Sequence, residues 1–199
     1  MFNSSCGDLW VKRIESPNRE EWAFLLKSKT MIQNKIDYIK RGAFDELFTP
    51  REAVECILPF IPKNVKTIWE CTAIENSEIV TVLKENGFSV VTSHIKDGKS
   101  FFDFEPDDYD MIITNPPYSL KDSFLKRAFE LNKPFMMLLP ITTLEGKKRS
   151  ELFRKYSIQV LIPDKRFNFI AAKKGSWFQT SWFTSGLQLE RDLNYIACL

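Results

Sequence analysis

Short apolar runs alternate with amphipathic segments from about residue 65 to residue 163. The apolar runs predict strands over 65–71, 88–95, 109–114, 134–140 and 158–163. The segments between them have apolar positions three to four residues apart, which predicts helices over 76–87, 121–132 and 146–156. Strands that alternate with helices are typical of an α/β protein with a parallel sheet covered on both faces.

The two ends of the chain follow other patterns. Apolar positions at helical spacing predict short helices over 18–28 and 30–42. A third helix is predicted over 50–60, with Thr49 as its N-cap and Pro50 in its first turn, where proline is tolerated. Segment 175–185 is predicted to form a hairpin or a broken strand. We therefore expect an N-terminal helical extension over 1–45 and one α/β domain over 46–199.

Charge and composition exclude several classes of protein. The 199 residues include 28 basic and 26 acidic ones, a net charge of +2, so contact with nucleic acid must come from a local basic patch. No apolar run approaches the ~18 residues that span a bilayer, which predicts no membrane role. Four scattered cysteines and a single histidine predict no metal site and free thiols, as in a reducing cytoplasm.

The most informative segment is Asn115-Pro116-Pro117-Tyr118, which follows the predicted strand 109–114. Two prolines make the turn stiff and remove two backbone donors. The Asn115 side-chain oxygen and the Pro116 carbonyl can then both accept hydrogen bonds from one planar amino group. Two such acceptors draw the nitrogen lone pair out of conjugation and hold it ready for in-line attack. Tyr118 offers a face on which a planar group can stack.

This segment resembles the amino-methylating class I S-adenosylmethionine-dependent methyltransferases, chiefly the N6-adenine enzymes and their small phage and mobile-element members. The resemblance covers about 48–182 and implies a Rossmann-like fold, with about seven mainly parallel strands, in a catalytic domain over 46–199. It also implies S-adenosyl-L-methionine as cofactor and DNA or RNA as substrate. The residues that it places at the cofactor are Thr49, Pro50, Glu70, Thr72, Ala73, Asn76, His94, Ser100 and Phe101.

The stretch after Glu70 departs from the family pattern, which continues with Gly-x-Gly. No glycine is present over 71–77. Glycine there permits a tight turn and a close approach of the backbone to the cofactor. Asn76 is the residue that can adopt a left-handed conformation in its place, whereas the β-branched Ile74 would do so at a cost. His94 and Ser100 stand where the family has acids near the ribose and the adenine.

Substrate contacts are less specific in the sequence. Phe169 resembles the later aromatic that sandwiches a flipped target base. Lys147 and Lys148 open a predicted helix on the active edge and fit either a phosphate contact or a solvated basic turn. Only 30 residues follow Phe169, so we expect recognition of a target sequence to come from short loops, the N-terminal helices or a protein partner.

Two other functions fit the same residues. The missing glycines favour a catalytically inactive methyltransferase-like protein that binds a protein or a nucleic acid, such as a phage-encoded inhibitor of host defence. Methylation of a glutamine side-chain amide would use the same turn, because that amide is also planar. Those enzymes usually carry a larger N-terminal domain than the ~45 residues present before Phe48.

Overall fold

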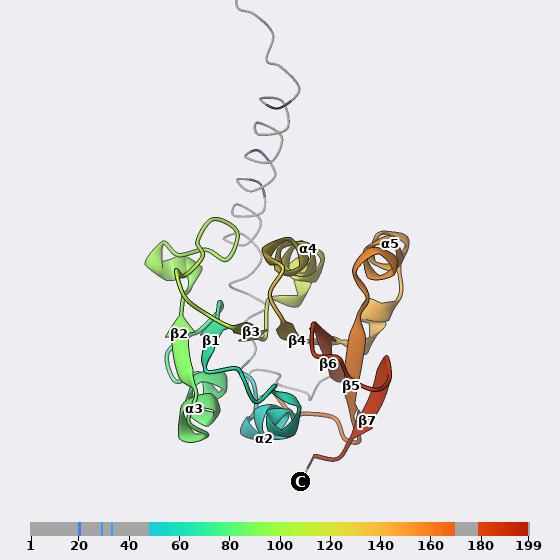
Figure 1. Ribbon diagram of the computed structural model, residues 1–199, viewed down its shortest axis with the longest axis horizontal. Helices are drawn as coiled ribbons and strands as arrows, with labels where there is room; N and C mark the ends of the chain where they lie inside the picture. Colours follow the sequence, from blue (N-terminus) through green and yellow to red (C-terminus); the bar gives the residue numbers. More distant parts are fainter. Residues whose placement is uncertain (1–19, 21–28, 30–32, 34–47, 170–178, 199) are drawn as a thin grey trace, which may run out of the picture.

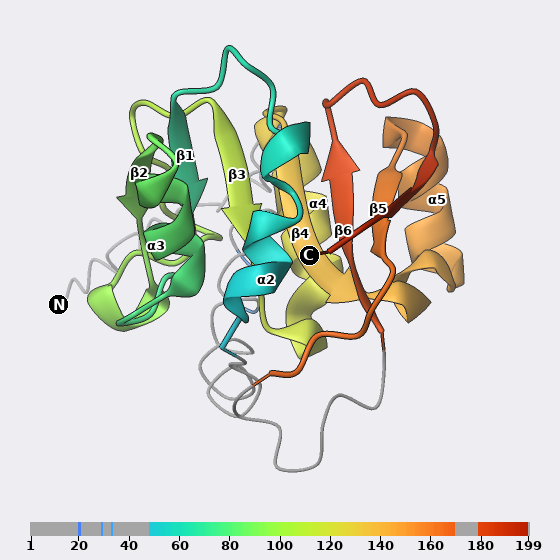
Figure 2. The same cartoon turned by 90° about the horizontal axis from the view of Figure 1, so that it is seen from below.

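The computed structural model describes residues 20, 29, 33, 48–169 and 179–198. Its centre is a seven-stranded sheet in the order β2-β1-β3-β4-β6-β5-β7. The strands are β1 (Thr67–Glu70), β2 (Ser89–Thr92), β3 (Met111–Thr114), β4 (Phe135–Pro140), β5 (Gln159–Pro163), β6 (Thr180–Ser185) and β7 (Leu193–Ile196). Only β6 runs against the others (Figure 2). The predicted α/β, Rossmann-like architecture with about seven mainly parallel strands is therefore confirmed.

Helices cover both faces of the sheet. Helices α2 (Arg51–Glu55) and α3 (Glu78–Glu85) lie on one face, and α4 (Lys121–Leu131) and α5 (Lys147–Tyr156) lie on the other (Figure 1). Helices α3 and α4 each bury an apolar stripe, for example Phe124, Leu125, Ala128 and Phe129 of α4, whereas α5 packs with the half-buried Leu152, Phe153 and Tyr156. The sheet thus separates two apolar layers, one beneath α2 and α3 and one beneath α4 and α5.

The central strands are buried on both faces, as their continuous apolar runs predict. All residues of β3 and β4 are buried, the pattern of strands that lie between two helical layers. The parallel partners of β1 are β2 on one side and β3 on the other. This arrangement brings the carboxyl ends of β1 and β3 side by side at one edge of the sheet.

The third predicted helix is shorter than expected. Only Arg51–Glu55 is α-helical, and a 3-10 turn, η2 (Leu58–Phe60), follows it. Pro59 lacks the N–H group that would continue the helical hydrogen bonds. The predicted N-cap was also wrong, because Pro50 holds that position and no side chain caps the helix. The Thr49 hydroxyl instead accepts a hydrogen bond from Asn115.

The C-terminal part also differs from the prediction. No hairpin forms within 180–185; these residues make one strand, β6, inserted antiparallel between β4 and β5, while 175–178 lie outside the described residues. The edge strand β7 was not predicted. Its pattern is mostly exposed, with only Ile196 buried, so it carries little apolar signal.

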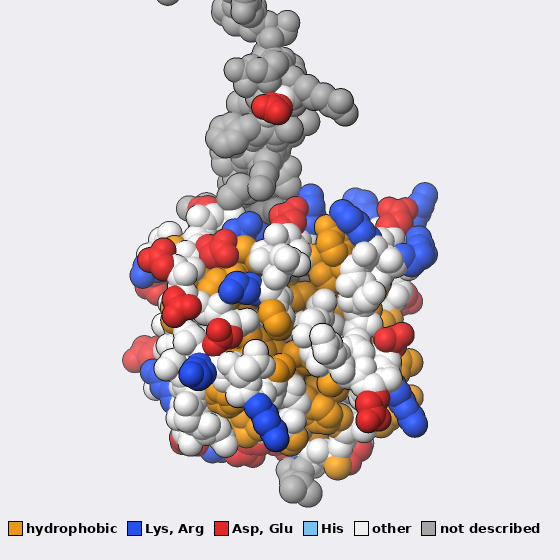
Figure 3. All heavy atoms as spheres, in the orientation of Figure 1, with side chains coloured by type: hydrophobic (Ala, Val, Ile, Leu, Met, Phe, Trp, Pro, Cys, Tyr) orange, Lys and Arg blue, Asp and Glu red, His pale blue; other side chains and the backbone are white. Residues whose placement is uncertain are grey.

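The predicted helices over 18–28 and 30–42 lie outside the described residues, apart from Glu20, Lys29 and Gln33, which are helical. The described helices include none with the length and apolar character needed to cross a membrane. Acidic and basic side chains are interspersed on the face seen in Figure 3, in keeping with the small net charge.

Candidate functional site

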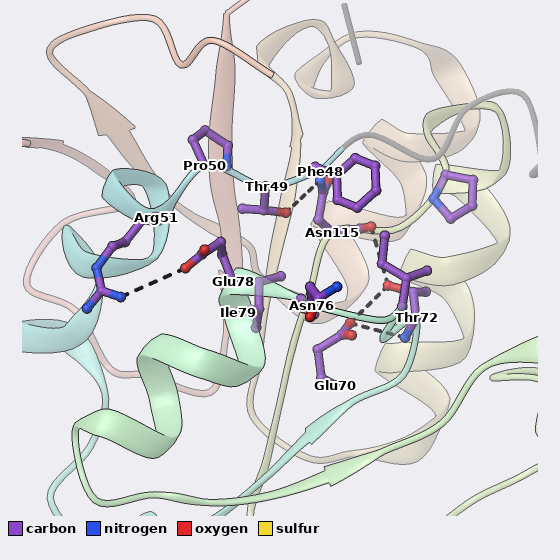
Figure 4. Close-up of a pocket in the computed structure, with 13 residues that line it drawn as sticks. Phe48, Thr49, Pro50, Arg51, Glu70, Thr72, Asn76, Glu78, Ile79 and Asn115 are labelled. Atoms are coloured by element: carbon purple, nitrogen blue, oxygen red, sulfur yellow. Dashed lines mark hydrogen bonds and ion pairs between the residues drawn. The ribbon is translucent and has the colours of Figure 1, made fainter. Parts of the chain in front are cut away.

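One cavity lies beside the carboxyl ends of β1 and β3, where the strand order changes direction across the sheet. From β1 the chain passes to β2 on one side and then to β3 on the other. Open α/β folds bind ligands in the crevice outside the carboxyl ends of strands at such a switch point. A cavity of about 430 Å³ occupies this place (Figure 4). It is lined by Phe48, Thr49, Pro50, Arg51, Glu70, Thr72, Ile74, Asn76, Ser77, Glu78, Ile79, Asn115 and Pro117.

Glu70 is a buried carboxylate at the end of β1 that lines this cavity. One of its oxygens, Oε1, accepts hydrogen bonds from the Thr114 hydroxyl (2.6 Å), the Thr72 hydroxyl (2.9 Å) and the Thr72 backbone N–H (3.1 Å). The hydroxyls of Thr72 and Thr114 also lie 2.7 Å apart. This network joins the ends of β1 and β3, while the described residues offer no donor to the second oxygen, Oε2.

Burial raises the pKa of Glu70 to about 7, although the hydrogen bonds from Thr114 and Thr72 act in the opposite direction. Removal from water disfavours the charged carboxylate more strongly than these donors stabilise it. A cationic ligand in the cavity would favour the ionised form. Glu70 is therefore suited to facing a positively charged group.

The loop after β1 makes its turn without glycine. Asn76 has a φ of 59°, in the left-handed region, and Ile74 has no positive φ. The Ser77 N–H donates to the Ile74 carbonyl at 3.2 Å, and α3 begins at the next residue. Asparagine tolerates this conformation better than other non-glycine residues. The predicted left-handed conformation of Asn76 is confirmed, and the loop leaves the cavity open.

Asn76→Val tests this backbone requirement. A β-branched residue is strained in the left-handed region, so we expect Asn76→Val to lower the free energy of unfolding by ~1–2 kcal/mol, measured by urea denaturation. Asn76→Gly should lower it by less than ~1 kcal/mol, because glycine adopts this conformation without strain. Equal losses in the two variants would show that the left-handed conformation is not required.

The diproline turn places Asn115 at the cavity wall. The Asn115 side-chain nitrogen donates to the Thr49 hydroxyl at 2.9 Å, and the Thr72 hydroxyl lies 3.4 Å from the Asn115 backbone carbonyl. Pro117 also lines the cavity, whereas Pro116 and Tyr118 are buried behind it. Residues 49, 72 and 115 come from three separate segments, so the fold assembles them.

A second cavity of about 450 Å³ shares Phe48, Ile74 and Asn76 with the first. Its other lining residues are Ala73, Glu75, His94, Lys96 and Asp97. The His94 Nδ1 atom accepts a hydrogen bond from the Lys96 N–H at 3.1 Å. That bond engages the Nδ1 lone pair of the imidazole.

Besides Pro116 and Tyr118, five of the predicted site residues line neither cavity and are packed or exposed elsewhere. Ser100 and Phe101 are 2% exposed, and the Phe101 ring stacks on Phe124 with centroids 4.9 Å apart. Phe169 is buried in the layer beneath α2 and α3. Lys147 and Lys148 are exposed at the start of α5.

Several lining residues were missed by sequence reasoning. Arg51 forms ion pairs with Glu55 (2.7 Å) and Glu85 and lies 3.9 Å from Glu78. These contacts tie α2 to both ends of α3, and Arg51 and Glu78 line one side of the cavity. The available signal was position alone, because Arg51 follows Thr49-Pro50 and Glu78 opens the helix after β1. Phe48, which the family resemblance places with Thr49 and Pro50 in the element at the methionine end of the cofactor, is 43% exposed and lines both cavities.

Comparison with known proteins gives matches of fold only. No protein-family model matches the sequence, and no curated protein matches it significantly. Similar solved structures include a modification subunit assigned to a type I restriction enzyme from Vibrio vulnificus YJ016, with a TM-score of 0.47 and 13% identity. That match covers 92% of this chain and 52% of the other, so the chain spans about half the length of that subunit.

Two further similar structures are named as methyltransferases. One is a release-factor-specific protein-(glutamine-N5) methyltransferase from Alicyclobacillus acidocaldarius, with 14% identity, a TM-score of 0.41 and coverage of 69% of this chain and 93% of the other. The other is assigned as an RNA methyltransferase from Pyrococcus horikoshii, with 15% identity, a TM-score of 0.42 and coverage of 79% and 98%. Because these TM-scores are below 0.5, the sheet order of this chain itself defines the fold.

Proposed function

We propose that this protein transfers a methyl group from S-adenosyl-L-methionine to an exocyclic amine, with N6 of adenine in DNA or RNA as the target. The observation that carries the proposal is the shared cavity of Asn115 and Glu70. Asn115 follows β3 and Glu70 ends β1, and both line the space at the switch point of the sheet. Asn115 and Glu70 thus lie at one site, although the Asn115 side-chain oxygen is itself buried in this conformation.

The residues around the cavities fit this cofactor. A volume of about 430 Å³ falls within the range of about 300–1,000 Å³ for small-molecule sites. Glu70 would face the cationic part of the cofactor, and His94, which lines the second cavity, stays a candidate contact of the ribose. Asn76, whose left-handed conformation turns the loop after β1, lines both cavities. When bound, the cofactor supplies an electrophilic methyl group on a sulfonium.

The target amine would be held by the diproline turn. Pro116 lines neither cavity and the Asn115 side-chain oxygen is buried in this conformation, so amine binding would require the turn to expose both acceptors. The Asn115 side-chain oxygen and the Pro116 carbonyl would then accept the two hydrogens of the amine and leave the nitrogen lone pair to attack the methyl carbon. The two prolines restrict the backbone between these acceptors. After transfer the methylated nitrogen carries a positive charge and releases a proton, so no strong base is needed before the attack.

Stacking of the base is assigned differently from the sequence prediction. Tyr118 and Phe169 are packed in the apolar layers, so neither presents its ring to the cavity in this conformation. Phe48 lines both cavities and is partly exposed. Its ring therefore offers a face on which a flipped base can stack. Lys147 and Lys148 stay candidates for phosphate contacts, and a protein partner stays a candidate source of specificity.

The alternative function is a catalytically inactive binding protein with the same fold. The burial of Tyr118, Phe169 and Phe101 favours it, because three aromatic side chains expected around substrate and cofactor serve the core instead. The intact Asn115 wall of the cavity favours the enzyme. Both functions are compatible with a local nucleic-acid contact.

Transfer of a labelled methyl group separates these functions. The full chain is incubated with methyl-labelled S-adenosylmethionine and single-stranded DNA, duplex DNA, RNA or a glutamine-containing protein, and the products are analysed by mass spectrometry. The proposal predicts label in N6-methyladenine of a nucleic acid. Label in a glutamine amide would contradict the assigned substrate, and no label in any polymer would favour the inactive protein.

A further inference from the structure

The contact between Thr49 and Asn115 links two segments 66 residues apart in the sequence. The Asn115 side-chain nitrogen donates to the Thr49 hydroxyl at 2.9 Å (Figure 4). Thr49 is only 8% exposed, so water competes little for this hydrogen bond. The contact lies in the wall of the cavity, because both residues line it.

Thr49 has a firm support on the helix that follows it. Pro50 fixes the backbone at the start of α2, with a φ of −69°. The Trp182 ring N–H donates to the Ala53 carbonyl at 2.8 Å, which attaches α2 to β6. The ion pairs of Arg51 attach α2 to α3. The backbone that carries the Thr49 hydroxyl is therefore held on its C-terminal side by α2.

The orientation of the Asn115 amide decides whether an amine can be held. An amide side chain has two donor hydrogens on nitrogen and an acceptor oxygen at the other end. If the nitrogen faced a target amine, donors would meet donors and no hydrogen bond could form. A bond from the nitrogen to Thr49 engages the donor end and orients the oxygen away from Thr49.

A hydroxyl group can either donate or accept a hydrogen bond. A second partner of the Thr49 hydroxyl therefore decides which of these roles it takes toward Asn115. Thr49 has one hydroxyl proton, and it lines the cavity proposed for the cofactor. A Thr49 hydroxyl that donates this proton to a ligand in the cavity can only accept from Asn115. Occupation of the cavity then fixes the amide in the orientation that the chemistry needs.

We propose that Thr49 is the positioning residue that sets the side-chain amide of Asn115 for amine binding. This inference rests on the proposed methyl transfer and adds a residue that acts through Asn115 and does not touch the amine. It predicts a loss of turnover when the hydroxyl is removed, with the shape of the side chain kept.

Thr49→Val and Thr49→Ser form the matched pair for the kinetic test. At saturating cofactor and nucleic acid, Thr49→Val should lower kcat at least ~10-fold, because a hydrogen bond that orients the amide is lost. Thr49→Ser keeps the hydroxyl and should stay within ~3-fold of the native chain. Thr81→Val, an exposed position on α3, controls for the same substitution outside the contact. An unchanged kcat in Thr49→Val, or equal losses in Val and Ser, would overturn the inference.

A double-mutant cycle tests the contact without any activity assay. Urea unfolding is measured for the native chain, Thr49→Val, Asn115→Ala and the double variant. We expect Thr49→Val to change the unfolding equilibrium constant ~3- to 10-fold more in the native background than in the Asn115→Ala background. Additive effects would contradict the pairing. Failure of the wider proposal looks different, since the native chain would then label no polymer while the cycle would still report the contact.

Discussion

Asn115→Ala is expected to reduce the turnover of methyl transfer by ~10²–10³-fold. The substitution removes the side-chain oxygen that would accept a hydrogen from the target amine. It also removes the hydrogen bond to Thr49, so the turn loses both its acceptor and its link to α2. Binding of S-adenosylmethionine should weaken less than ~10-fold, because Glu70 and the loop at Asn76 are unchanged. Turnover is measured with labelled cofactor, and affinity by titration calorimetry.

Asn64→Ala is a matched control for this variant. Asn64 is exposed in the segment before β1 and lines neither cavity, so its replacement should leave turnover within ~2-fold. The expected pattern is a large loss of kcat with a retained cofactor site in Asn115→Ala alone. Turnover that survives Asn115→Ala would place the amine elsewhere and would refute the diproline turn as its holder.

The second large effect is on stability, through Glu70. Its pKa in the folded chain is about 7 against an ordinary value of 4.5, so folding favours the protonated acid. A raised pKa means that this stabilising contribution is fully present below about pH 4.5 and is lost as the pH rises to about 7. The shift corresponds to about 3 kcal/mol in total, of which roughly 2–3 kcal/mol falls between pH 5 and pH 8.

Glu70→Gln removes this dependence because glutamine does not titrate. The glutamine side-chain oxygen can still accept hydrogen bonds from Thr72 and Thr114, so these donors keep their acceptor. Urea denaturation at pH 5 and pH 8 should show the variant gaining roughly 2–3 kcal/mol relative to the native chain at the higher pH. Glu151→Gln, at an exposed position on α5, should show the same change in the free energy of unfolding between pH 5 and pH 8 as the native chain. If Glu70→Gln also showed the same pH dependence of the free energy of unfolding as the native chain, burial would not raise the pKa of Glu70.

The sequence pattern was sufficient to predict the strands and helices that carry the site residues. Alternating apolar runs and amphipathic segments predict β1 to β5 and the helices between them, because each period reflects burial on one or two faces. The position of Asn115 after β3 and Glu70 at the end of β1 then follows from a parallel sheet. The left-handed conformation of Asn76 could also be predicted, since the loop needs such a residue and contains no glycine.

Other features depend on tertiary contacts that local patterns do not encode. The insertion of β6 between β4 and β5 depends on long-range pairing. The sequence around Phe101 and Phe102 does not show whether their rings face a ligand or the core. In the structure both rings pack with Phe124. Thr49 has the signature of an N-cap, but its hydroxyl bonds to Asn115, whose proximity only the fold creates.

Titration of the purified chain with S-adenosylmethionine tests the central claim most directly, because every further step requires the cofactor in the cavity between β1 and β3. We predict saturable binding to one site, competed by S-adenosylhomocysteine and abolished by Asn76→Trp, whose large side chain would fill the space beside Ile74. Absence of binding at millimolar cofactor, with the chain shown to be folded, would contradict the account.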